Sequence, residues 1–185
     1  MKKVFIDGSA GTTGLRIFDR LHRRTDIQLL TLPESERKLE ASRKKMLNEA
    51  DVVFLCLPDD AACEAALWVE NPDTVVLDTS TAHRTAPGWC YGFPELSPVQ
   101  EARLRQAKRI AVPGCHASGF IALVYPLVSA GLLTPDALLS CYSLTGYSGG
   151  GKKMIAEYCA PERSFLLNAP RQYALGQTHK HLKEM

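Results

Sequence analysis

The amino-acid sequence predicts an α/β protein: a doubly wound parallel sheet with helices on both faces, followed by an incomplete α+β part. Two observations lead to this fold class. Through the first 114 residues, short apolar runs alternate with segments of helical character. These runs lack polar alternation, which is typical of parallel strands because helices bury both faces of their sheet. We expect the first domain to span 1–116 and the second to span 117–185.

The expected elements follow one another along the chain. Apolar runs predict strands at 2–7, 27–32, 51–57, 74–80 and 109–114. Helices are expected at 15–24, 34–49, 61–69 and 117–128. A last strand is expected at 138–147. Because the second part has too few strands to close a core, its apolar side chains should remain exposed.

Composition narrows the classes of function. Hydrophobic residues make up 45% and charged residues 23% of the chain, as in ordinary soluble domains. The net charge of +2 gives no reason to expect a nucleic acid or an anionic membrane as partner. No apolar run reaches the roughly 18 residues of a membrane span, and Met1 leads straight into a strand. We therefore expect a cytoplasmic protein without a signal peptide.

The cysteines and the paired histidines do not indicate a metal site. The six cysteines form no C-x-x-C pair, so they are interpreted as reduced thiols rather than disulfides or zinc ligands. His179 and His181 lie two residues apart, but no further ligands at metal-binding spacing accompany them. No metal is expected.

A glycine-rich turn follows the first strand. Its glycines have the spacing G-x-x-G-x-x-G, which is related to the fingerprint of dinucleotide-binding (Rossmann) domains. Such a turn brings backbone N–H groups at a helix N-terminus close to a pyrophosphate. The alternative is merely a tight strand-to-helix turn. The residues expected to bind the cofactor here are Gly8, Ala10, Gly11, Thr12, Thr13 and Gly14.

The residues after the second strand indicate which dinucleotide is bound. A free ribose 2′-hydroxyl usually meets an Asp or Glu at this position. Here Ser35, Arg37 and Lys38 follow the strand, and a hydroxyl with two cations suits a 2′-phosphate, which favours NADP over NAD. The alternative is that these residues belong to a solvated, charged helix. Ser80, at the carboxyl end of the fourth strand, is expected beside the same cofactor.

Later motifs carry further polar groups. Arg84 follows the fourth strand closely, and Glu95 lies in a loop bounded by Gly and Pro. The stretch "GYSGGGKK" at 146–153 is a glycine-rich turn that ends in two lysines, an arrangement suited to an anion. It lacks the spacing of a P-loop, which argues against an ATPase.

Six motifs stand in the order and spacing of one enzyme family: "GSAGTTG", "DTSTAHR", "YGFPEL", "PGCHASGF", "GYSGGGKK" and "YALGQTHKHLKEM". The sequence resembles N-acetyl-gamma-glutamyl-phosphate reductases, in particular the shorter variant of that family. These are enzymes of arginine biosynthesis related to aspartate-semialdehyde dehydrogenases. Two features depart from the family: His116-Ala117-Ser118 stands where Tyr-Pro-Thr is common, and chains of the family continue well beyond Met185.

The resemblance implies an NADPH-dependent reduction of N-acetyl-glutamyl phosphate to N-acetyl-glutamate semialdehyde and phosphate, through a cysteine thioester. It implies Cys115 as the nucleophile. Independently, Cys115 follows Pro-Gly and precedes an expected helix, whose N-terminal amides and dipole lower the pKa of a thiol. The family places its acid/base in the His-x-His segment, where His179 and His181 both match, and the sequence does not choose between them.

Substrate residues are assigned with the help of the same resemblance. They are Arg84, Glu95, Ser148, Gly149, Lys152 and Arg171. Arg84 corresponds to a phosphate-binding arginine of the related dehydrogenases, and the glycine-rich turn supplies hydroxyl, amide and ammonium groups for the same phosphate. For Arg171 and Glu95, a structural salt bridge is the alternative.

Three other functions compete with this one. An aspartate-semialdehyde dehydrogenase would use the same cysteine on a smaller substrate, although "GYSGGGKK" and "HKHLKE" argue against it. A non-catalytic NADP-binding module is a second alternative, and a cysteine hydrolase, which needs no dinucleotide loop, is a third. In the family the second domain also builds the interface of a homo-oligomer. We therefore expect the isolated 185 residues to bind NADPH with little or no reductase activity.

Overall fold

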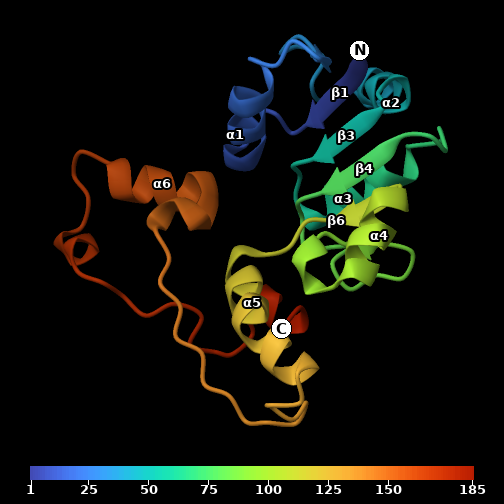
Figure 1. Ribbon diagram of the computed structural model, residues 1–185. Helices are drawn as coiled ribbons and strands as arrows, with labels where there is room; N and C mark the ends of the chain where they lie inside the picture. The colour runs from blue at the N-terminus through green and yellow to red at the C-terminus, as the bar shows by residue number, and fades with distance from the viewer.

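A parallel sheet of six strands forms the centre of the first part of the molecule (Figure 1). The computed structural model describes all residues, 1–185. The strands are β1 (Lys2–Asp7), β2 (Ile27–Leu30), β3 (Val52–Leu55), β4 (Val75–Asp78), β5 (Cys90–Tyr91) and β6 (Arg109–Ala111). Their order in the sheet is β2-β1-β3-β4-β6-β5, and every neighbouring pair is parallel. This confirms the predicted fold class.

Helices connect the strands and cover the sheet. They are α1 (Thr12–Leu21), α2 (Glu40–Glu49), α3 (Asp59–Leu67) and α4 (Pro98–Gln106), with a short 3-10 helix η1 (Pro94–Leu96) before α4. The chain runs outward from β1 to β2 and then returns past β1 to β3. Because such crossovers are right-handed, this reversal puts α1 and α2 on opposite faces, as Figure 1 shows. The reversal also opens a crevice at the carboxyl ends of β1 and β3.

The core lies between the sheet and α2 and α3. Leu47 of α2, Val53 and Leu55 of β3 and Val76 of β4 are fully buried. Few polar side chains interrupt the short strands, because helices cover both faces of the sheet. This rigid core holds the carboxyl ends of the strands, and with them the polar residues that follow, in fixed positions.

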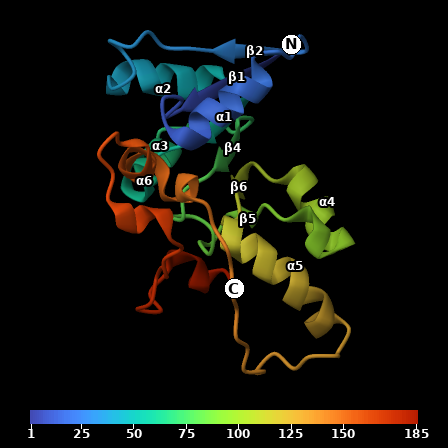
Figure 2. The same ribbon diagram turned by 90° about the vertical axis from the view of Figure 1, so that its left-hand side faces the viewer.

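The second part has helices but no strands. Its elements are α5 (Cys115–Ser129), η2 (Tyr147–Gly150), α6 (Gly151–Cys159), η3 (Phe165–Asn168) and η4 (Lys180–Lys183). Long segments without regular structure join them, and the C-terminal η4 returns to α5 (Figures 1 and 2). The expectation of exposed apolar side chains is confirmed, since Leu138 and Tyr142 are 101% and 88% exposed. None of the helices has both the length and the apolar character required to cross a membrane.

Two expectations about individual elements were wrong, and two elements were not predicted. Residues 138–147 do not form a strand, because no neighbouring strand is present to pair with their backbone. The second helix begins at Glu40 rather than at residue 34, because Pro33 starts a series of turns through residue 38. The sequence analysis also missed β5 and α4, although Ser97 caps α4 by accepting a hydrogen bond from the Gln100 backbone N–H.

Candidate active site

The glycine-rich turn joins β1 to α1 and needs its glycines for steric reasons. Gly8 has φ +83°, and a Cβ at this position would lie 2.2 Å from the Cys56 carbonyl oxygen. A Cβ at Gly14 would lie 2.4 Å from the Gly8 carbonyl oxygen. Gly11 donates a hydrogen bond from its N–H to that same oxygen at 2.9 Å. The turn therefore packs directly against β3, and only glycines fit at its two ends.

The N-terminus of α1 is open to an anion. Gly11 is its N-cap and offers no side chain to the first N–H groups, and the first turn holds no acidic residue. Thr12 and Thr13 open the helix. Unpaired N–H groups at the positive end of a helix are a binding site for phosphate groups. This turn fits the pyrophosphate of a dinucleotide.

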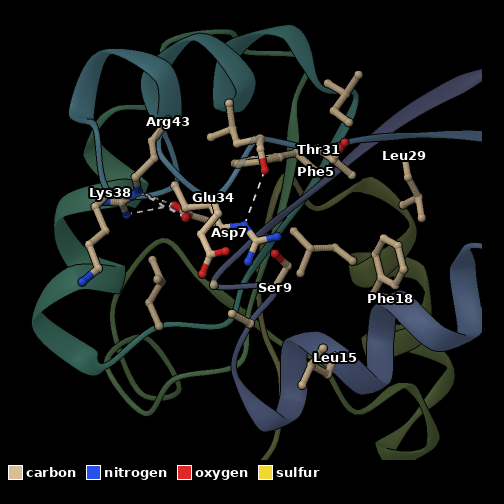
Figure 3. Close-up of a pocket in the computed structure, with 17 residues that line it drawn as sticks. Phe5, Asp7, Ser9, Leu15, Phe18, Leu29, Thr31, Glu34, Lys38 and Arg43 are labelled. Carbon is tan, nitrogen blue, oxygen red and sulfur yellow. Dashed lines mark hydrogen bonds and ion pairs between the residues drawn. The ribbon is translucent and has the colours of Figure 1, made fainter.

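A cavity of about 800 Å³ lies beside the turn, between α1 and the residues that follow β2 (Figure 3). Gly8 and Ala10 line it from the turn, and Arg37 and Lys38 line it from the loop after β2. Ser35 is not among its lining residues, whereas Glu34 is. The cavity therefore combines an apolar interior with two cations and a carboxylate at the end of β2.

An ion pair in the wall of this cavity was missed by the sequence analysis. Arg43 of α2 donates a hydrogen bond from Nη2 to Oδ2 of Asp7 at 2.9 Å, and its Nε lies 3.2 Å from both oxygens. The guanidinium also lies 4.7 Å from the ring centroid of Trp68. Asp7 is buried at the end of an otherwise apolar strand. A charge at that position is the signal that could have indicated a buried partner.

The residues after β4 form a buried polar cluster. Asp78 is fully buried and accepts two hydrogen bonds from Ser80, one from the hydroxyl at 2.6 Å and one from the backbone N–H at 2.9 Å. His83 places Nδ1 2.6 Å from Asp78 Oδ2, and its ring stacks on Trp89 with the centroids 3.9 Å apart. Ser80 therefore lies at the carboxyl edge of the sheet as expected, with its hydroxyl already donated to Asp78.

Cys115 is the first residue of α5, and Gly114 is the N-cap. The side chain is exposed, as are those of Cys63, Cys141 and Cys159. Burial raises the pKa of the Cys56 thiol to about 11. Among the exposed cysteines, Cys115 is the one that begins a helix at the carboxyl end of a strand. That position gives its sulfur the field of the helix dipole.

The two histidines of the His-x-His segment differ in their surroundings. His181 is buried, and its Nε2 faces Gly114: a Cβ there would lie 2.5 Å from that nitrogen. Burial is the largest cause that lowers the pKa of His181 to about 4, and Arg84 adds to it. His179 is half-buried and has a pKa below its ordinary value, again mainly through burial. The structure thus places His181 directly beside the residue that precedes Cys115.

Arg84 lies in the same place but is already paired. Its Nη1 donates to Oε1 of Glu184 at 2.6 Å, Nε donates to the Val112 carbonyl at 2.9 Å, and Nη2 lies 3.2 Å from the Thr79 carbonyl. The other oxygen of Glu184 accepts hydrogen bonds from the Tyr91 hydroxyl at 2.8 Å and from the Gly114 N–H at 2.9 Å. Burial raises the pKa of Tyr91, and the Glu184 carboxylate raises it further. Glu184 and Tyr91 are therefore site residues that the sequence analysis missed.

The remaining candidates are not part of this hydrogen-bond network. Glu95 lies in η1 and is exposed, and Arg171 pairs with Glu157 at 3.3 Å on the surface. Ser148 and Gly149 lie in η2, and Lys152 lies in α6. Both views draw α6 well apart from α5 (Figures 1 and 2). η1 packs against α5, so Glu95 belongs to an element that contacts the helix of Cys115. The part of all these residues in substrate binding stays a prediction.

Two family matches cover most of the chain. Residues 3–104 match the family described as "Semialdehyde dehydrogenase, NAD binding domain", which is more than half of the chain. The chain belongs to the semialdehyde dehydrogenase family. Residues 115–185 match the dimerisation domain of the same family, so the second match begins at Cys115. The dinucleotide turn and the cysteine thus lie in the two domains that define these enzymes.

Curated relatives narrow the comparison within the semialdehyde dehydrogenase family. The chain is 49% identical to N-acetyl-gamma-glutamyl-phosphate reductase 2 of Pseudomonas putida, over 98% of this chain and 58% of that protein. It is 50% identical to N-acetyl-gamma-glutamyl-phosphate reductase of Chelativorans sp., over 99% of this chain and 58% of the relative. The chain thus spans about three fifths of the length of these relatives.

Solved structures share the fold. Aspartate semialdehyde dehydrogenase II from Vibrio cholerae, solved in complex with ASA, matches with a TM-score of 0.65 at 17% identity, over 94% of this chain and 55% of that one. Aspartate semialdehyde dehydrogenase with NADP from Candida albicans matches with a TM-score of 0.51 at 21% identity, over 70% of this chain and 47% of that one. At these identities the likeness concerns the fold alone.

Proposed function

We propose that this protein is an NADPH-dependent reductase of N-acetyl-glutamyl phosphate, which forms N-acetyl-glutamate semialdehyde and phosphate in arginine biosynthesis. The observation that carries the proposal is Cys115 at the N-terminus of α5, with His181 against the adjacent Gly114. Reductases of this name are 46–50% identical to the chain over nearly all of its length. A small-molecule acyl phosphate, a cytoplasmic location and a homo-oligomeric assembly belong to the same proposal.

The chain's own residues suit the chemistry of an acyl phosphate. Cys115 gives its thiol proton to a neutral imidazole and attacks the carbonyl carbon, after which phosphate leaves and a thioester remains. NADPH, when bound, supplies the hydride that reduces this thioester. The imidazolium then gives its proton to the oxygen of the tetrahedral adduct. When the adduct collapses, the imidazole takes that proton back and passes it to the departing sulfur, so that the aldehyde and the Cys115 thiol are released. We assign the imidazole to His181, since it is the ring that faces Gly114.

The cofactor preference rests on the cavity beside the dinucleotide turn. The turn and the N-terminus of α1 would hold the pyrophosphate, and Arg37 and Lys38 would meet a 2′-phosphate. Glu34 lies in the same wall and would accept a ribose hydroxyl. Two cations against one carboxylate favour the phosphorylated cofactor. Ser80 already donates its hydroxyl hydrogen to Asp78, so it would bind the cofactor as a hydrogen-bond acceptor.

The experiment that tests the function is a steady-state assay with NADPH and N-acetyl-glutamyl phosphate. It should be run on these 185 residues and on a chain extended with the remaining two fifths of a relative. Aspartyl phosphate serves as the second substrate, because it separates the proposal from an aspartate-semialdehyde dehydrogenase. We expect turnover of the acetylated substrate by the extended chain and its loss in Cys115→Ser, with NADPH binding retained. If the extended chain turned over aspartyl phosphate faster, or bound NADPH without any turnover, the proposal would be overturned.

A further inference from the structure

Three histidines from distant parts of the chain meet next to Cys115. His116 lies in the first turn of α5, whereas His179 and His181 come from the C-terminal segment that packs on it. The ring centroid of His116 lies 5.6 Å from that of His179 and 5.7 Å from that of His181. The centroids of His179 and His181 are 4.6 Å apart. The His116 ring therefore lies next to both rings of the His-x-His segment.

A hydrogen bond fixes the position of the His116 ring. Its Nδ1 lies 2.6 Å from the Ser143 hydroxyl oxygen. Ser143 belongs to the exposed segment between α5 and η2 and has no other hydrogen bond from its side chain. The residue that follows the nucleophile is thus held by a specific contact rather than by burial alone.

We propose that His116 is a positioning residue of this active site, which packs across His179 and His181 and keeps both rings uncharged beside Cys115. The physical cause is repulsion between like charges at less than 6 Å, which disfavours a second proton in the cluster. For its role in the reaction, the inference rests on the proposed function. A neutral ring accepts the proton of the Cys115 thiol, whereas an imidazolium does not.

The hydrogen bonds of the two partner rings also favour their neutral forms. Nδ1 of His179 accepts a hydrogen bond from the His181 backbone N–H at 3.2 Å, so a proton there would displace that contact. Nδ1 of His181 is buried and has no hydrogen-bond partner, so a charged ring would leave the N–H of an imidazolium at that atom without an acceptor, while Nε2 faces Gly114 and can take a proton. Both rings have lowered pKa values, with burial as the first cause and the charge of His116 among the others.

Other charged and titratable groups also face the cluster and affect the pKa values of its rings. They are Arg84, Tyr173, Lys180, Glu184 and the thiol of Cys115. Arg84 and Lys180 oppose a proton on the rings, whereas Glu184 favours one. His116 is the residue of the cluster whose ring lies next to the rings of both other histidines.

The test is an NMR titration of the histidine ring protons, which requires no reductase activity. His116→Phe removes the charge and keeps a flat ring, whereas His116→Lys keeps a charge and removes the ring. We expect the titration midpoint of His179 to rise by about 0.5 pH or more in His116→Phe, the size of a like charge at this distance in water. In His116→Lys it should stay at or below the wild-type value. His22, which stacks on Phe18 of α1, is the internal control and should not move.

The outcomes separate this inference from the proposed function. Equal midpoints of His179 in wild type, His116→Phe and His116→Lys would overturn the inference, because packing alone would then account for His116. If His116→Phe does not fold, Ser143→Ala takes its place: it frees the ring and should raise the midpoint less, in the same direction. An unchanged midpoint in that variant also counts against the inference. Shifted midpoints in a chain whose extended form shows no turnover would uphold the inference and refute the proposed function.

Discussion

The two parts of the molecule hold their structure in different ways. In the first part, strands and helices bury a continuous apolar core, in which Leu47, Val53, Leu55 and Val76 are fully excluded from solvent. Beyond Ile121 the only buried residue is His181. Burial of apolar area is the main source of folding free energy, so the first part carries most of the stability. The second part lacks such a core, and its stability has another source.

That second source of stability is a small set of polar contacts at the C-terminus. The side chain of Glu184 is 1% exposed and joins Arg84, Tyr91 and the N–H of Gly114, three groups contributed by the first part and the start of α5. These contacts hold His181 against Gly114. The comparison teaches that the dinucleotide turn is built into the apolar fold, whereas the cluster of Cys115, His179 and His181 depends on the one buried carboxylate of Glu184.

The largest effect on stability is expected from removing the charge of the Glu184 carboxylate. Glu184→Gln leaves the Arg84 guanidinium buried without a counter-charge, which costs about 3–5 kcal/mol for a buried pair. Native-state hydrogen exchange should show early opening of the segment around η4, while the amides of β1, β3 and β4 stay protected. Glu157→Gln is the matched control, since its pair with Arg171 is about half exposed and contributes at most about 1 kcal/mol. Similar opening in both variants would contradict the special role of Glu184.

A truncation in each part tests the difference in burial directly. Leu55 is fully buried in β3, and Leu138 is fully exposed. Leu55→Ala should lower the free energy of unfolding by about 2–5 kcal/mol, because it removes transfer free energy and leaves a cavity. Leu138→Ala should change it by less than about 0.5 kcal/mol. Urea titration of both variants measures this, and a comparable loss from Leu138→Ala would show that the second part has its own core.

The pH dependence of stability reports on His181. Its pKa in the folded protein is about 4, below the ordinary 6.5. As the pH falls below 6.5, the unfolded chain binds a proton that the folded chain resists, so the free energy of unfolding decreases down to about pH 4. Two and a half pH units correspond to a loss of roughly 3 kcal/mol. Above pH 6.5 the residue contributes no slope.

Urea titrations of wild type and His181→Gln between pH 7 and pH 4 isolate this contribution. The variant has no titrating group at this position, so the difference between the two unfolding free energies should shrink as the pH is lowered. A constant difference across this range would show that His181 accepts a proton as readily in the folded protein as in the unfolded chain.

The sequence predicted the first part well because its signals are local. Apolar runs, helical periodicity and glycine spacing each act within about ten residues, and they located the strands, the dinucleotide turn and the start of α5 near Cys115. The expected strand at 138–147 failed for the opposite reason. A strand requires a partner, and whether a partner lies beside a segment is decided by the tertiary structure.

The polar contacts of the site were also beyond the reach of local patterns. Glu184 and Arg84 are 100 residues apart in the chain, and Arg43 and Asp7 are 36 apart. Arg84 was assigned to substrate phosphate from the resemblance, and the structure shows its guanidinium paired with Glu184. The sequence could not choose between His179 and His181, because only burial and the contact with Gly114 distinguish the two rings.

The smallest effect is expected in the cofactor site, which lies wholly within the first part. Arg37→Glu combined with Lys38→Glu places negative charge where a 2′-phosphate would bind, so NADPH affinity should fall by about tenfold more than NADH affinity, or about 1.4 kcal/mol. Arg103→Glu with Arg105→Glu on α4 changes the net charge equally and serves as the control. Fluorescence titration with both cofactors measures these affinities.

The same titration completes the comparison between the two parts of the molecule. Because the turn and its cavity are held by β1, β2, β3 and α1, Glu184→Gln should leave NADPH affinity within about twofold of wild type even when η4 is released. Weaker NADPH binding in Glu184→Gln would show that the C-terminal segment supports the dinucleotide site as well, and that the two parts are coupled.

An equal loss of NADPH and NADH affinity in the variant with Arg37→Glu and Lys38→Glu would show that these two residues do not recognise the 2′-phosphate.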